Sequence, residues 1–288
     1  MTQQTNSQSN LSIVLPCYNP PKYWEKTVVE SVLELEKRIS QNIELVIVND
    51  GSTQNIASEH LSYISEKLNT FTPIEYTENR GKGYALRQGV AVCTTDLIIY
   101  TDIDFPYTLE SIEAMLVELK KGTDVVLGHR GQEYYKKTPR FRKVISKTLR
   151  WFLKTFLRLP TDDSQCGIKG YNKIGKQAFL DTKIDRFLFD LEFIKLASRR
   201  KMNCKTVTVT LKPNVIFSKV NLEAVLDSVD DELQAVYREK RIYNEAWIDD
   251  NITDVMGHWV KEEKLIPPIV IWNERTNRNI HRRTPTLW

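Results

Sequence analysis

Short apolar segments that alternate with helical patterns restrict the fold of this chain more than any other feature. Buried strands of a parallel sheet are joined by crossover helices, so this alternation predicts an α/β domain with a mostly parallel central sheet flanked by helices. The apolar segments predicted to be strands are 11–16, 43–50, 97–102, 123–129 and 206–211. Helical patterns cover 24–39, 54–68, 108–121, 190–200 and 221–240, and a glycine-rich turn within 80–92 opens a further helix.

The length of 288 residues is enough for one large domain, or for a domain with an appendage. We predict a disordered tail over 1–10, the α/β domain over 11–217 and a helical and irregular C-terminal extension over 218–288. The net charge of +4 is small, so any basic function must be local. The four cysteines lie far apart and form no CxxC pair, which argues against a zinc site or a redox pair.

The first ten residues, MTQQTNSQSN, are polar and lack the apolar core of a signal peptide. No apolar run approaches the roughly 18 residues that a transmembrane helix needs. Scattered single cysteines suit a reducing compartment. The sequence therefore predicts a cytoplasmic protein, with peripheral attachment to the inner face of a membrane as a further expectation.

Residues 134–158 form a basic segment with nine lysine and arginine residues and no acid. Ile145, Leu149, Phe152 and Phe156 share one face of a predicted helix within it. We favour an amphipathic segment that binds an anionic membrane surface. A helix packed on the core with a solvated basic face is the second interpretation. Binding to nucleic acid is the last, and no nucleic acid is expected as a partner.

Three aspartates follow predicted strands, at the edge where open α/β sheets bind ligands. Asp50 ends the strand 43–50, where it either accepts a hydrogen bond from a base or ribose, or forms a turn and caps the next helix. Asp102 and Asp104 end the strand 97–102 as two like charges one residue apart. They either share Mg²⁺ or Mn²⁺ with phosphate oxygens, or are solvated loop carboxylates.

Two further segments carry polar residues with open alternatives. The turn 80–83 has glycines that let backbone N–H groups approach an anion, and Lys82 adds a positive charge. It fits a nucleotide-diphosphate pocket, or it is a plain loop before a helix. Asp190 at the start of the helix 190–200 is either a helix N-cap or a catalytic base.

The order of the motifs along the chain resembles that of family 2 glycosyltransferases, which have the Rossmann-like GT-A fold. The motifs are LPCYNP, VNDGS, NRGKGYALRQG, YTDID, GHR, DDSQCGIKGYN and FLFDLEF, and the resemblance covers 11–217. It is nearest to the transferases that move sugars onto polyprenyl phosphates, the dolichyl-phosphate mannosyl- and glucosyltransferases. SQCGIKGYN together with RFLFDLE is more similar to the glucosyl branch.

The resemblance implies roles for individual residues. Donor residues would be Pro16, Tyr18 and Asp50 at the base and ribose, Lys82 and Arg130 near the diphosphate, and Asp102, Ile103 and Asp104 as the D-x-D element that holds the metal and the diphosphate. Residues implied for the acceptor phosphate are Arg130, Arg142 and Ser146. The chain departs from the family at two prolines: Pro20 replaces a common acid, and Pro106 replaces a common glutamine.

The implied chemistry inverts the sugar's anomeric configuration, because the acceptor attacks opposite the leaving diphosphate. A lipid phosphate needs no strong base, whereas a hydroxyl acceptor needs a carboxylate, with Asp163 or Asp190 as candidates. With Asp104 these are the candidate catalytic residues. We favour a transferase of a hexose, glucose from UDP-glucose, to a polyprenyl phosphate; a GDP-sugar is the second donor. A soluble transferase to a glycan or small-molecule hydroxyl is the first alternative, and a non-catalytic sugar-nucleotide-binding module is the second.

Overall fold

The computed structural model describes residues 10–131, 161, 163, 166–186 and 189–213. The chain divides into two compact units, Met1–Ala235 and Val236–Trp288, and every described residue belongs to the first. The basic segment 134–158, the predicted helix 221–240, residues 1–9 of the predicted tail and residues 218–288 of the predicted extension lie outside the described residues.

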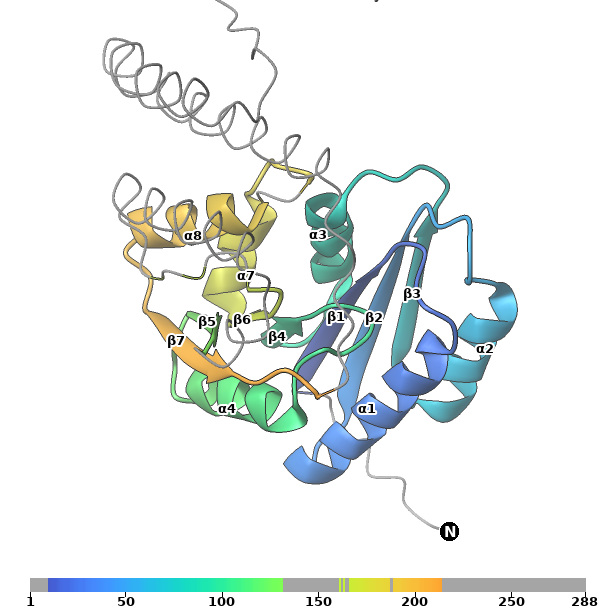
Figure 1. The fold of residues 1–288 in the computed structure, drawn as a ribbon. Coiled ribbons are helices and arrows are strands. Elements are labelled where there is room, and N and C mark those ends of the chain that lie inside the picture. Colours follow the sequence, from blue (N-terminus) through green and yellow to red (C-terminus); the bar gives the residue numbers. More distant parts are fainter. Residues whose placement is uncertain (1–9, 132–160, 162, 164–165, 187–188, 214–288) are drawn as a thin grey trace, which may run out of the picture. The chain divides into compact units, whose positions relative to one another are not determined.

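The described part of the chain is built on a seven-stranded sheet with the order β3-β2-β1-β4-β6-β5-β7 (Figure 1). Every neighbouring pair is parallel except the two that involve β6, which runs antiparallel to both β4 and β5. The mostly parallel α/β sheet predicted from the sequence is therefore confirmed. The strands are β1 (Leu11–Cys17), β2 (Ile43–Asp50), β3 (Phe71–Tyr76), β4 (Leu97–Tyr100), β5 (Val125–Arg130), β6 (Lys169–Tyr171) and β7 (Cys204–Val209).

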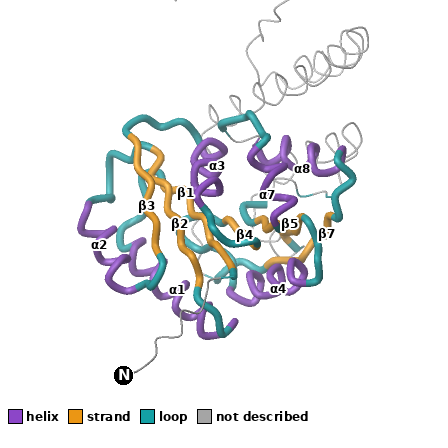
Figure 2. Tube along the Cα trace, turned by 180° about the vertical axis from the view of Figure 1, so that it is seen from behind, coloured by secondary structure: helices purple, strands orange, loops and turns teal. Residues whose placement is uncertain are grey.

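Helices cover both faces of this sheet, as Figures 1 and 2 show from opposite sides. On one face Leu11, Ile13 and Leu15 of β1 belong to a core cluster with side chains of α1, α2 and α4. On the other face Val14 and Val48 lie against α3, and α7 and α8 follow α3 in the same layer. The helices are α1 (Trp24–Ile39), α2 (Ser58–Lys67), α3 (Lys82–Val92), α4 (Leu109–Lys120), α7 (Lys173–Leu180) and α8 (Phe189–Arg199).

The central strands are buried along their whole length because helices cover them from both sides. All eight residues of β2 are buried, and six of the seven residues of β1 are buried. The predicted bounds 24–39 and 43–50 agree with those of α1 and β2. In the described part of the chain, no helix is long and apolar enough to span a membrane.

Three elements of the structure are not among the predicted strands and helices, namely β3, β6 and α7. The strand β6 has the sequence KGY, which is too short for a two-residue alternation to show and carries a charge and a glycine. The helix α7 follows at once, with the side chain of Asn172 accepting hydrogen bonds from the N–H groups of Ile174 and Gly175. Both lie in and after the motif SQCGIKGYN.

Candidate functional site

The carboxyl ends of β1, β2 and β4 meet at one edge of the sheet, because the three strands are parallel neighbours. This edge brings together residues that the sequence placed at separate strand ends. Pro16 lies opposite Val48 in the β1–β2 register, and Tyr18 follows β1 with 54% of its surface exposed. Asp50 is the last residue of β2, and Asp102 follows β4 after Thr101.

Asp50 organises the turn that opens α3. One carboxylate oxygen accepts a hydrogen bond from the Arg80 N–H at 2.8 Å. The other accepts from the Gly81 N–H at 2.9 Å and from the side-chain amide of Asn79 at 3.0 Å. Asp50 itself is buried, so these bonds replace the water it loses. The bonds of Asp50 go to the turn before α3, so among the described contacts Asp50 does not cap the next helix along the chain, α2, as one interpretation of the sequence had it. Contact with a base or ribose stays a prediction.

Gly51 allows this turn to approach the end of β2. Its φ of +68° is in the left-handed region, and a β-carbon there would lie 2.5 Å from the backbone nitrogen of Asn79. A side chain at this position would therefore push the 79–81 turn away from Asp50. The glycine in VNDGS is thus explained by a close backbone approach.

Lys82 is the first residue of α3 and forms an ion pair with Asp102. Its ammonium nitrogen lies 2.5 Å from Oδ1 of Asp102, and the two side chains are 25% and 40% exposed. Burial opposes the charge on Lys82, but Asp102 and Asp190 more than offset it, so the pKa of Lys82 is raised. The pairing was not foreseen, because sequence spacing does not show that the start of α3 faces the end of β4.

Gly167 lies directly against the same carboxylate. A β-carbon at Gly167 would be 2.6 Å from Oδ2 of Asp102, and its backbone N–H donates to the hydroxyl of Tyr107 at 3.0 Å. The glycine therefore leaves the space that Asp102 occupies. In the sequence this glycine stands out only as part of the motif DDSQCGIKGYN. Nothing in a single sequence indicates that it contacts Asp102.

A tight turn separates the two aspartates of the D-x-D element. The carbonyl of Asp102 accepts from the N–H of Phe105 at 3.0 Å, and Phe105 is buried with a φ of +46°. As a result Ile103 is buried while Asp104 is exposed. The surrounding protein still removes part of the solvent from Asp104, and the charge of Asp102 adds repulsion. The pKa of Asp104 is raised for these reasons.

Lys212 approaches the same turn from the segment after β7. Its backbone N–H donates to the carbonyl of Pro106 at 2.8 Å, and its ammonium lies 5.8 Å from the ring centre of Phe105. Burial lowers the pKa of Lys212, and the charges of Asp104 and Glu30 oppose that change. Sequence analysis did not single out this lysine, because it lies 108 positions after Asp104 and belongs to no recognisable motif.

The two aspartates fit a divalent cation only if other oxygens complete its shell. Carboxylates are the hard ligands that Mg²⁺ and Mn²⁺ prefer. Among the described residues, no group of three or more His, Cys, Asp or Glu side chains could hold a metal. The repulsion that raises the pKa of Asp104 is what a cation between the two would relieve. The pair therefore suits a cation that arrives with phosphate oxygens, and does not form a metal cage.

Arg130 and Asp163 form a second charged pair, at the carboxyl end of β5. The guanidinium donates to both oxygens of Asp163, from Nε at 2.9 Å and Nη2 at 2.5 Å, and the Arg130 backbone N–H adds a bond at 2.9 Å. Burial raises the pKa of Asp163, but the bonds from Arg130 outweigh it and the pKa is lowered. Arg142 and Ser146 lie outside the described residues, so the acceptor-phosphate pocket stays a prediction.

Asp190 lies in the first turn of α8 and is almost completely buried. It pairs with the ammonium of Lys169 at 2.8 Å and accepts a hydrogen bond from the hydroxyl of Tyr100. Burial and the charge of Asp190 raise the pKa of Tyr100 well above its usual value. Asp190 is inside the helix, so the N-cap interpretation does not describe its position. Sequence reasoning missed Lys169, because the strand β6 that buries it is too short to be recognised from the sequence.

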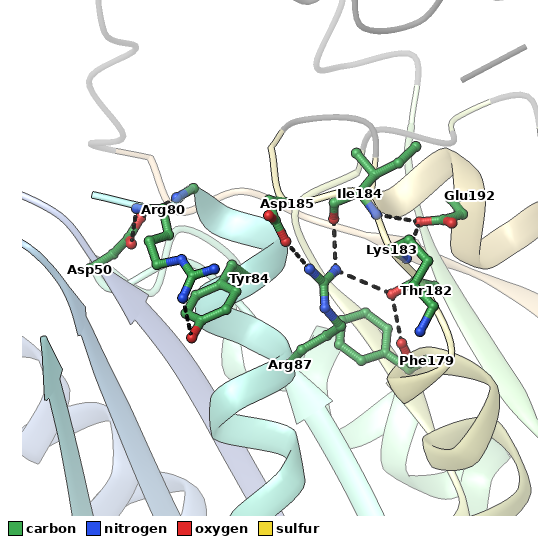
Figure 3. Close-up of polar contacts among 11 residues, drawn as sticks. Asp50, Arg80, Tyr84, Arg87, Phe179, Thr182, Lys183, Ile184, Asp185 and Glu192 are labelled. Carbon is green, nitrogen blue, oxygen red and sulfur yellow. Dashed lines mark hydrogen bonds and ion pairs between the residues drawn. The ribbon is translucent and has the colours of Figure 1, made fainter. Parts of the chain in front are cut away.

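The segment 182–185 ties α3 to the beginning of α8 (Figure 3). Arg87 of α3 donates to the carbonyl of Ile184 at 2.7 Å and forms an ion pair with Asp185. Glu192 of α8 accepts from the N–H groups of Lys183 and Ile184, both at 2.8 Å. These contacts fix the start of α3, which carries Lys82, relative to the start of α8, which carries Asp190.

Comparison with known proteins assigns the described part of the chain to a family. The family model described as "Glycosyl transferase family 2" matches residues 12–187. The chain belongs to glycosyl transferase family 2. The match covers β1 to α7 and includes Asp50, Asp102 and Asp163. The resemblance seen in the order of the sequence motifs is therefore confirmed.

Curated relatives of this family 2 protein include dolichyl-phosphate β-glucosyltransferases. One from Trichomonas vaginalis is 31% identical over 210 residues, which are 69% of this chain and 64% of the relative. Those of Saccharomyces cerevisiae and Homo sapiens are 26% and 28% identical and cover 72% and 69% of this chain, and 68% and 66% of their own lengths. The chain thus spans less than two thirds of the Trichomonas protein.

A solved structure supports the fold. Mannosyl-3-phosphoglycerate synthase from Rubrobacter xylanophilus has a TM-score of 0.55 with 14% sequence identity, over 81% of this chain and 74% of the other. At that identity the likeness concerns the fold alone. Together with the sheet topology it confirms the predicted GT-A fold.

Proposed function

We propose that this family 2 protein is a metal-dependent, inverting glycosyltransferase. It transfers a hexose, glucose from UDP-glucose, to the phosphate of a polyprenyl phosphate. The relatives named dolichyl-phosphate β-glucosyltransferases support both the sugar and the acceptor class. A GDP-sugar is the second choice of donor.

The observation that carries the proposal is the pair Asp102 and Asp104 beside the start of α3. Both follow the carboxyl end of β4, and Lys82 brings a positive charge to the same place. Mg²⁺ or Mn²⁺ bound there would supply Lewis-acid stabilisation of the leaving diphosphate. The N-terminus of α3 offers N–H groups toward an anion. Asp50 keeps this turn in place through its bonds to residues 79–81.

The base and ribose of the donor would bind at the end of β1. Tyr18 is more than half exposed there. Arg80 stacks on the ring of Tyr84 at 3.7 Å near the Asp50 turn, and Tyr84 contacts Tyr76 at the end of β3, so aromatic rings and a cation also lie at this end of the sheet. These residues would hold the nucleotide while Asp102, Ile103 and Asp104 hold the diphosphate end.

The environments of Asp163 and Asp190 favour a phosphate acceptor over a hydroxyl. A hydroxyl acceptor needs a carboxylate that can take its proton. Asp163 is fixed by Arg130, which also lowers its pKa, and Asp190 is buried between Lys169 and Tyr100. A lipid phosphate is already anionic and needs no such base. Arg142 and Ser146 would complete its binding site with Arg130, and the basic segment 134–158 would hold the protein on an anionic membrane surface from the cytoplasmic side.

A donor-by-acceptor panel tests the proposal. Purified protein with Mn²⁺ or Mg²⁺ is given UDP-glucose or GDP-mannose, each with a short-chain polyprenyl phosphate or the corresponding polyprenol. We expect transfer from UDP-glucose to the phosphate only, loss of turnover in EDTA, and a β-linked product from the α-linked donor. Transfer to the polyprenol with none to the phosphate would overturn the acceptor, and full activity in EDTA would overturn the metal.

A further inference from the structure

Lys82 lies where the start of α3 faces the end of β4. It is the first residue of α3, and its ammonium contacts Oδ1 of Asp102 at 2.5 Å. The other oxygen of Asp102 faces Gly167, which leaves room for it but offers no side chain. Among the described residues, Lys82 is therefore the cation that holds one of the two carboxylates predicted to bind the metal.

Further lysines and aspartates surround this ion pair. Lys82 interacts electrostatically with three carboxylates. Two of those carboxylates have a lysine of their own nearby, because Asp190 pairs with Lys169 and Asp104 lies near Lys212. The described cluster comprises Asp102, Asp104 and Asp190 with Lys82, Lys169 and Lys212. Glu30 also faces Lys212 and Asp163 faces Lys169, so the lysines do not outnumber the acids.

The ion pair between Lys82 and Asp102 bears on which ligand the cluster can accept. A divalent cation alone would take Asp102 from Lys82 and leave that ammonium without its partner in a partly desolvated place, which is unfavourable. A divalent cation that arrives with a dianionic nucleotide-diphosphate sugar adds no net charge. The cluster is therefore suited to the metal and the diphosphate as a unit.

We propose that Lys82 is a resident countercharge that the metal must displace from Asp102, so that the protein binds the bare metal weakly and binds it well only together with the donor diphosphate. The inference rests on the proposed function, because it takes the nucleotide diphosphate as the ligand. The long, flexible stem of lysine lets the ammonium move from Asp102 to an anion without a change in the backbone. The ammonium of Lys82, which first pairs with Asp102, then pairs with the diphosphate and positions it.

The test measures binding instead of turnover. Bound and unbound Mn²⁺ are separated by electron paramagnetic resonance, with and without UDP, for the wild type and Lys82→Met. For the wild type we expect weak binding of bare Mn²⁺ and a large gain when UDP is added. For Lys82→Met we expect bare Mn²⁺ to bind roughly tenfold more tightly, about the contribution of one charge-assisted hydrogen bond, and the gain from UDP to shrink.

Two further variants make the result specific to Lys82. Lys82→Arg keeps a positive charge at the start of α3 and should bind bare Mn²⁺ as weakly as the wild type. Lys205→Met removes a lysine outside the site, whose ammonium lies 3.0 Å from a carboxylate oxygen of Glu118. This variant should change neither the binding of bare Mn²⁺ nor the gain from UDP. This control separates loss of the Asp102 partner from a general loss of positive charge.

The possible outcomes separate this inference from the proposed function. If Lys82→Met binds bare Mn²⁺ no more tightly than the wild type, the countercharge proposal is overturned, whatever the protein transfers. If bare Mn²⁺ behaves as expected but UDP and GDP both fail to bind the wild type with Mn²⁺, the donor assignment fails while the competition between Lys82 and the metal stands. Equal binding of Mn²⁺ to Lys82→Met and Lys82→Arg would also overturn the proposal.

Discussion

Two lysine–aspartate ion pairs lie near the carboxyl ends of the parallel strands, and they differ in the elements that they join and in their exposure to solvent. Lys82 and Asp102 connect α3 to the end of β4 and are partly exposed, at 25% and 40%. Lys169 and Asp190 connect β6 to α8 and are buried, at 0% and 8%. The difference teaches that burial decides whether an ion pair can be exchanged for a ligand or serves as a fixed part of the fold.

The energetics of the two pairs follow from their solvent access. A partly exposed pair keeps part of its hydration when it is broken, so its net contribution is smaller than that of a buried pair and its partners can separate. A buried pair loses far more when one partner disappears, because the other charge has no water to solvate it. Tyr100 donates to Asp190 and so adds to the fixed character of the second pair. On this basis we propose that the first pair takes part in ligand binding and that the second stabilises the fold.

Applying the same substitution to both lysines tests this comparison most strongly. Lys169→Met should lower the free energy of unfolding by about 3–5 kcal/mol, because the buried Asp190 loses its ion-pair partner and keeps the hydrogen bond from Tyr100. Lys82→Met should lower it by about 1 kcal/mol or less. Urea denaturation followed by circular dichroism gives both values. Equal losses for the two variants would contradict the distinction.

Removal of the acid from the exchangeable pair should affect function and not the fold. We expect Asp102→Asn to reduce transfer at least roughly 100-fold, because a neutral amide cannot balance a divalent cation on a diphosphate. Asp104→Asn should behave in the same way. Unfolding of both variants should stay close to that of the wild type. The check is steady-state transfer beside thermal melting, and an active Asp102→Asn enzyme would remove the D-x-D element from the mechanism.

Gly167 offers a way to disturb Asp102 without changing its charge. The β-carbon of Gly167→Ala would lie 2.6 Å from Oδ2 of Asp102, the mobile end of a side chain, so the carboxylate should move while the backbone stays. We expect Mn²⁺–UDP binding to weaken roughly tenfold, about one charge-assisted bond, with little loss of stability. Gly131→Ala is the matched control, since its β-carbon would lie 3.5 Å from Thr208, an ordinary contact. Similar binding by both variants would argue against the close approach.

A third ion pair, Arg130–Asp163, extends the comparison, because its contribution to the free energy of unfolding should depend on pH. Burial raises the pKa of Asp163, yet Arg130 lowers it overall, so the folded protein holds this proton less tightly than the unfolded chain. Its stabilising contribution is then fully present above the unfolded value of about 3.9, and is lost as the pH falls through the lower folded value. Asp163→Asn should lack this part of the acid dependence of unfolding. Identical acid dependence in both proteins would show that the pair has no such role.

The sequence was sufficient for the elements with strong local patterns. The apolar run of β2 and the apolar face of α1 gave bounds that agree with the structure, and the aspartates at strand ends do gather at one edge. The partners of those aspartates could not be predicted, because each pairing joins distant segments. Lys82 is 20 positions from Asp102, Arg130 is 33 from Asp163, and Lys169 is 21 from Asp190. Only the folded chain shows that the start of α3, the end of β5 and the buried strand β6 contact those carboxylates.

The antiparallel strand β6 has a consequence for how the protein forms during synthesis. The strands β1 to β4 and the aspartates at their ends can come together as soon as residue 104 has left the ribosome, since they pair only with one another until β6 arrives. In the native sheet β5 has β6 and β7 as its neighbours, so it must wait for residues 169–171. We therefore expect a nascent chain whose residue 104 is outside the ribosome to protect the edge formed by β1, β2 and β4 from proteases, while the Arg130 side becomes protected only after residues 169–171 have emerged.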